Sequence, residues 1–153
     1  LIDKYSKDGD QNRFIFPNTS VPGLDFSFSG IKTSFLYFIN DNVKKNQNFI
    51  KDHINNISAS IQRKLIDMLL DKLKLAINHY KVKDISICGG VAANSLLRKE
   101  VKNLSTKLNI NVHIPKMEYC TDNAAMIANY AYYMFNDKKF SDFNIVPYSK
   151  NTI

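Results

Sequence analysis

The order of apolar patterns in the second half of the chain leaves few folds open to it. The run ISIC at 85–88 is short and rich in β-branched residues, which is typical of a buried strand, and it stops at a pair of glycines. An amphipathic stretch at 96–108 follows, then the alternating run INVHIP at 110–115, and then a second amphipathic stretch at 125–135. This order of strand, helix, strand and helix predicts an α/β layer with parallel strands.

Two further helices are predicted before this layer. Apolar residues recur at helical spacing over 31–43 and again over 57–76, where the pattern covers about five turns with charges on the other face. The chain has 153 residues, of which 44% are hydrophobic, so we expect 1–153 to be a single domain with one core.

The domain is predicted to have three parts. Residues 1–24 are rich in turn formers, so we expect an irregular lead-in there. Residues 25–136 form the α/β core, and 137–153 form a tail.

Charge and cysteine content narrow the class of protein. The net charge of +7 is of the kind that attracts polyanions such as nucleic acid, although the lysines are spread along the chain. Cys88 and Cys120 form neither a CxxC pair nor a disulfide framework, so we expect free thiols in a reducing compartment. No apolar run approaches the ~20 residues of a membrane helix, and no leader pattern opens the chain, so we expect no membrane span and no signal peptide.

The turn after the first predicted strand is a candidate ligand site. Ligands of such layers lie beyond the carboxyl ends of the strands, where CGGVAAN at 88–94 and EYCTDN at 118–123 both fall. Gly89 and Gly90 allow a positive φ and the close approach of a ligand, and the Asn94 amide can donate to and accept from a nucleoside. The structural alternative is that the glycines only make the turn while Asn94 caps the next helix.

Asp122 is a candidate metal ligand, and Ser29 is a candidate phosphate or ribose contact. Asp122, or Thr121 beside it, can instead cap the following helix. One carboxylate cannot hold a divalent ion alone, and the three histidines have no metal-site spacing. Ser29 lies in DFSFSGIKTS, which is predicted to precede a helix and lacks the spacing of a phosphate-binding loop, so capping is again the alternative. No protein nucleophile with an adjacent base is visible.

Three stretches in the order VPGLDFSFSGIKTSFL, GGVAANSLLR and YCTDNAAMIA resemble the C-terminal half of the tRNA N6-adenosine threonylcarbamoyltransferase (TsaD) family, in its bacterial form. The resemblance runs roughly from residue 3 to residue 135. It implies one ribonuclease H-like lobe of the actin and sugar-kinase (ASKHA) superfamily fold, with the ligand cleft between this lobe and a second one.

The resemblance also implies an activity. Family members are cytoplasmic acyltransferases that move the threonylcarbamoyl group from threonylcarbamoyl-AMP to N6 of adenosine 37, in tRNAs reading codons that begin with A. The implied partners are tRNA, a non-catalytic paralogue and a small ATPase, with no membrane. The nucleophile is the amine of the substrate, which fits the absence of a protein nucleophile.

The implied site residues match the candidates above. Gly89, Gly90 and Asn94 would contact the adenylate, and Asp122 would bind one metal ion, iron or else zinc. The remaining metal ligands in the family are histidines of an HxxxH motif outside this chain, so we expect these 153 residues to be inactive alone.

Two alternatives stay open. The chain could be a non-catalytic scaffold lobe of the same fold that docks partners. A metalloprotease is the other reading, but the HExxH motif of such enzymes is absent from the sequence.

Overall fold

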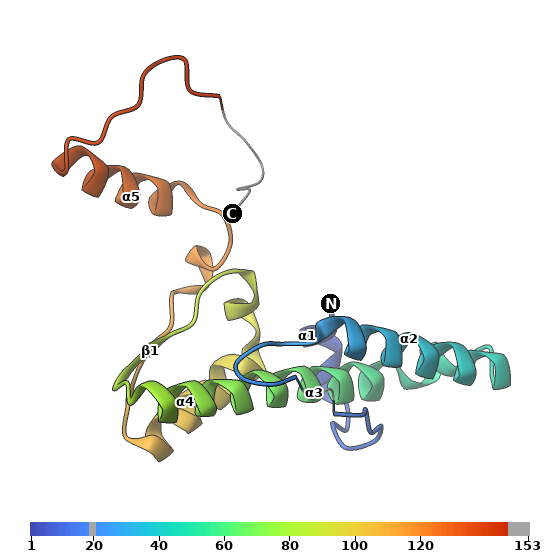
Figure 1. The fold of residues 1–153 in the computed structure, drawn as a ribbon. Helices are drawn as coiled ribbons and strands as arrows, with labels where there is room; N and C mark the ends of the chain where they lie inside the picture. The colour runs from blue at the N-terminus through green and yellow to red at the C-terminus, as the bar shows by residue number, and fades with distance from the viewer. Residues whose placement is uncertain (19–20, 147–153) are drawn as a thin grey trace.

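A single long helix, α3 (Phe49–Tyr80), carries most of the packing in the computed structural model, which describes residues 1–18 and 21–146. Figure 1 shows α2 (Phe28–Lys45) beside one half of α3. The 32 residues of α3 include no glycine or proline, which would interrupt a helix. The helix is capped at its C-terminal end by Lys81, which has the left-handed backbone conformation. The helix predicted over 57–76 is therefore confirmed, and it is longer at both ends.

The predicted order of strand, helix, strand and helix is confirmed. Strand β1 (Asp84–Ser86) pairs in parallel with β2 (Asn111–His113), in a register that sets Ile85 opposite Val112. Helix α4 (Ser95–Leu108) connects the two strands, and α5 (Ala124–Asn136) follows them. The chain is thus a mixed α/β protein with a small parallel sheet.

The junction after β1 differs from the prediction. A short 3-10 helix, η2 (Gly90–Ala93), separates the strand from α4, so the two glycines do not lead directly into α4. Both strands are also only three residues long, shorter than the predicted runs. A second 3-10 helix, η3 (Met117–Tyr119), follows β2 in the same way.

The lead-in predicted to be irregular over 1–24 is partly helical. Helix α1 (Ile2–Tyr5) and the 3-10 turn η1 (Ser6–Asp8) both pack on α3. The prediction failed because polar groups of α3 organise this segment. The backbone N–H of Phe14 donates to Ser60 Oγ (3.1 Å), and that of Asp10 donates to Asn56 Oδ1 (2.9 Å).

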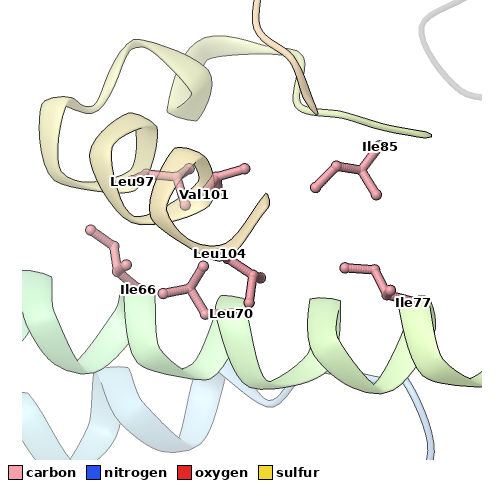
Figure 2. Close-up of a cluster of buried hydrophobic side chains, with 7 residues drawn as sticks. All are labelled: Ile66, Leu70, Ile77, Ile85, Leu97, Val101 and Leu104. Atoms are coloured by element: carbon pink, nitrogen blue, oxygen red, sulfur yellow. The ribbon is translucent and has the colours of Figure 1, made fainter. Parts of the chain in front are cut away.

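The core consists of two clusters that share α3. Figure 2 shows the first, in which side chains of α3 and α4 interdigitate beneath β1; its buried members are Ile66, Leu70, Ile77, Ile85, Leu97, Val101 and Leu104. The second cluster joins Phe16 and Ile31 to Ile61 of α3, with phenylalanine rings packed edge to face around them. These clusters fix α4, and with it the loop before α4, on the α3 scaffold.

Helix α5 has an apolar face, as predicted, but none of its residues is buried. Ile127 and Phe135 are each 66% exposed, and the ribbon in Figure 1 extends away from the other helices. The predicted tail begins beyond α5, and its residues 147–153 lie outside the described part of the chain. No helix within 1–18 and 21–146 combines the length and hydropathy that crossing a bilayer requires.

Candidate functional site

The two candidate loops leave the same edge of the sheet. Because β1 and β2 are parallel neighbours, the segments after Ser86 and after His113 both start at the carboxyl ends of the strands. Arg98 of α4 bonds to both: its Nη1 donates to the carbonyl of Ala92 (2.9 Å) and its Nη2 to the carbonyl of Pro115 (2.8 Å). The structure therefore brings the two predicted loops together.

Gly89 and Gly90 play different parts in the turn. Gly89 has φ 80° and ψ 177°, a backbone conformation that is essentially restricted to glycine. Gly90 has no positive φ, and a Cβ built on it would meet no atom within 4 Å. Conformation thus explains the first glycine, whereas neither conformation nor packing within the described chain explains the second.

Asn94 is committed to contacts within the protein. Its Oδ1 accepts from the backbone N–H of Leu97 (2.9 Å), which is the predicted cap of α4. Its Nδ2 donates to Gln62 Oε1 (2.8 Å), and Gln62 Nε2 donates in turn to Ser6 Oγ (2.8 Å). One N–H and one lone pair of the Asn94 amide remain for a ligand.

The start of α4 is also occupied. The Asp3 carboxylate accepts from Ser95 Oγ (2.7 Å) and from the Ser95 backbone N–H (3.3 Å). A carboxylate thus already faces the positive end of the helix dipole, which is a place where an anionic ligand could otherwise bind. The exposed backbone of the turn at Gly89 and Gly90, rather than the first turn of α4, is therefore the part left open.

Asp122 does not cap α5, nor does Thr121. The cap is Asn123, whose Oδ1 accepts from the backbone N–H of Met126 (3.0 Å). Asn123 is the last residue before the helix, and its backbone has the extended conformation of a cap. The capping group is therefore its amide and not the predicted Asp122 carboxylate. Within the described chain, the exposed Asp122 carboxylate has no hydrogen-bond or ion-pair partner.

The fit of Asp122 to a metal ion is limited to one ligand position. Among residues 1–18 and 21–146, no three histidine, cysteine, aspartate or glutamate side chains are grouped to hold an ion. An exposed carboxylate can supply one oxygen to a divalent cation, so Asp122 does not complete a site by itself.

Ser29 lies inside α2 rather than before it. The helix begins at Phe28, so Ser29 is an exposed residue of the first turn, and Ser27 holds the N-cap position. The sequence prediction placed the helix start too late because it followed the apolar spacing from Ile31 onward. No contact joins Ser29 to the two loops in the described structure.

An apolar groove that the sequence did not predict lies beside the glycine turn. Its volume is about 570 Å³, and its lining includes Phe26, Phe28, Cys88 and Val91. The alternating DFSFS pattern is the only sequence signal for it. The groove brings the segment before Ser29 and the segment around Gly89 to one surface.

Two charge interactions connect elements around the sheet and the long helix. Asp84, at the opposite end of β1, accepts from His113 Nε2 (3.1 Å) and Asn111 Nδ2 (2.9 Å), and these hydrogen bonds lower the pKa of its carboxyl. The hydrogen bond to Asp67 raises the pKa of Arg63, which also pairs with Glu100 (3.2 Å). The first interaction joins β1 to β2 and the second joins α3 to α4, so we assign both a structural role.

Comparisons with known proteins confirm the family that the sequence resembles. The family model described as tRNA N6-adenosine threonylcarbamoyltransferase matches residues 1–129. Proteins of that name from Christiangramia forsetii and Thermosipho africanus are 43% and 45% identical to the chain, over 150 and 145 residues. These alignments cover 98% and 92% of this chain but only 44% and 42% of the relatives. The chain therefore spans less than half the length of the relatives it matches.

Proposed function

Because this chain belongs to the tRNA N6-adenosine threonylcarbamoyltransferase family, we propose that it forms the part of such an enzyme that holds the threonylcarbamoyl-AMP donor. The observation that carries the proposal is Gly90. Neither its φ nor its surroundings within the described chain requires a glycine, and the bare backbone leaves room for a ligand to lie against it.

The proposed reaction requires no nucleophile from this chain. N6 of adenosine attacks the carbonyl carbon of the threonylcarbamoyl group, a carbon–nitrogen bond forms, and the bond from that carbon to the phosphate oxygen breaks. AMP leaves, and the amine loses one proton. The residues of the chain bind and orient the donor: the turn at Gly89 and Gly90 supports it, and the free N–H of Asn94 donates to its nucleoside.

We propose that Asp122 supplies one ligand of a divalent metal ion, iron or else zinc. A bound ion of this kind polarises a carbonyl group. The other ligands would be the histidines of the implied motif outside these 153 residues, since the described residues include no group of three side chains that could hold an ion.

The wider setting follows from the family. The parent enzyme would have the ASKHA fold and work in the cytoplasm, on tRNA, together with a non-catalytic paralogue and a small ATPase. The net charge of +7 favours contact with the phosphates of tRNA.

One observation favours the second candidate, a non-catalytic scaffold lobe. The Asn94 amide bonds to Leu97 and Gln62, as a purely structural residue would. Asp122→Ala in the complete protein separates the two functions, measured as modified adenosine in tRNA by mass spectrometry. We expect the modification to be lost, because the variant lacks the proposed metal ligand. The side chain has no hydrogen-bond or ion-pair partner in the described chain, so a structural defect would not explain the loss. Unchanged modification would leave the scaffold function.

A further inference from the structure

Arg98 is the side chain that connects the two loops of the candidate site. Its guanidinium donates to the carbonyl of Ala92 (2.9 Å) in the loop after β1 and to the carbonyl of Pro115 (2.8 Å) in the loop after β2. Its Nη1 also contacts Cys120 Sγ (3.7 Å). The guanidinium thus contacts Ala92, two residues after Gly90, and Cys120, two residues before Asp122.

The surroundings of these contacts make them strong and specific. Ala92 is 1% exposed, so its carbonyl would be buried and unsatisfied without the donor, and Cys120 beside the guanidinium is 2% exposed. The carbonyl of Pro115 belongs to a half-buried residue. The guanidinium offers several N–H groups in a rigid fork, whereas a lysine ammonium is a single point that cannot span both carbonyls. The two loops are therefore held together by a feature specific to arginine.

We propose that Arg98 is a positioning residue, which sets the distance between the glycine turn that supports the donor and the Asp122 carboxylate. We call the contacts of Arg98 with Ala92 and Pro115 the Arg98 clamp. The effect of the clamp on catalysis rests on the proposed function, but the clamp itself is a property of this chain. The hydrogen bonds of Arg98 go to Ala92, Pro115 and Cys120, so we assign it no direct contact with the donor or the metal ion. Its loss should let the Asp122 loop shift relative to the turn while both loops keep their own local bonds.

The two cysteines provide a direct test on the chain as it stands. Cys88 is exposed, and Cys120 is buried with its Sγ also donating to the Lys116 carbonyl (3.5 Å). A thiol reagent should therefore modify Cys88 quickly and Cys120 slowly, read out peptide by peptide with mass spectrometry. In Arg98→Lys, we expect modification of Cys120 to be about 10-fold faster or more, the equivalent of one lost charge-assisted bond. The Cys88 rate should not change.

Arg63→Lys is the matched control. Arg63 lies on α3 and pairs with Asp67 and Glu100, away from both loops, so the same substitution there should leave Cys120 protected. An equal acceleration in both variants would indicate general loosening and would overturn the clamp, as would unchanged Cys120 protection in Arg98→Lys. If Arg98→Lys unfolds, Arg98→Ala with added guanidinium ion provides a second test. Restored protection of Cys120 supports the clamp, and lack of restoration contradicts it.

Kinetics of the complete enzyme test the positioning role separately. Arg98→Lys should lower kcat for threonylcarbamoyl transfer about 10-fold or more, while KM for threonylcarbamoyl-AMP stays within about 3-fold, because the donor turn is intact and only its relation to Asp122 is lost. A raised KM with unchanged kcat would refute the role. If the wild-type protein transfers nothing while Cys120 still responds to Arg98→Lys, the proposed function fails and the clamp stands.

Discussion

Replacing Gly90 by alanine separates a ligand site from a simple turn. The added methyl group meets no atom within 4 Å, and the backbone of Gly90 is outside the left-handed region. The substitution should therefore not destabilise the chain, and the lower entropy of the unfolded state should raise the free energy of unfolding by about 0.4–1 kcal/mol. A donor that lies against the backbone would instead collide with the methyl group.

The size of the binding defect follows from the cost of inserting a methyl group into a filled contact. Overpacking of this kind costs about 1–3 kcal/mol, which corresponds to an affinity about 5–150-fold weaker. Two assays are required: urea unfolding of the 153-residue chain, and calorimetric titration of the complete protein with a non-hydrolysable threonylcarbamoyl-AMP analogue.

Gly89→Ala is the control for Gly90→Ala. At φ 80° and ψ 177° an alanine is strained, so stability should fall by about 1–3 kcal/mol. Wild-type affinity in Gly90→Ala would show that no ligand lies against this glycine, and our reason for placing the donor there would be wrong. A clear loss of stability in Gly90→Ala would contradict the open space around it.

Two further predictions concern single side chains. Asn94→Ala removes the cap of α4, so the free energy of unfolding should fall by about 0.5–2 kcal/mol in urea titrations. In the complete protein, the affinity for the adenylate analogue should weaken by about 1 kcal/mol, because one hydrogen bond is lost. A stability loss with unchanged affinity would leave Asn94 a structural residue only. Asp84 has a lowered pKa, because it accepts from His113 and Asn111, so its stabilising effect is present above the ordinary pKa of 3.8 and is lost as the pH falls through the folded value. Asp84→Asn should reduce the acid dependence of the unfolding free energy in that window, and an unchanged pH profile would argue against this assignment.

Local patterns explain what the sequence predicted well. The β-branched run before Gly89 and the helical spacing after it identified the strand, the turn and α4 without reference to distant residues. The parallel pairing of β1 with β2 followed from the order of elements alone. Asn94 was weighed as a cap, and the structure confirms that contact.

The misses have two causes, which are support from residues far apart in the chain and neighbouring residues of similar capping type. Helix α1 was not predicted, because four residues carry little periodic signal and its support comes from α3. The connection of Arg98 to Pro115 crosses 17 positions and leaves no sequence pattern. The cap of α5 was misassigned by one residue, since Thr121, Asp122 and Asn123 are all good capping types and only the backbone conformation decides among them.

The two clusters on α3 make this helix a shared structural element with a consequence for cooperativity. Leu65 and Met68 pack on the phenylalanine-rich cluster, while Ile66 and Leu70 of the same turns belong to the cluster with α4. Opening either cluster alone leaves these turns protected by the other, so their amide protons should exchange with solvent only when both open. A substitution that loosens the cluster around Phe16 should therefore also lower the stability of the α3 turns that hold α4. Global unfolding should then involve both clusters together.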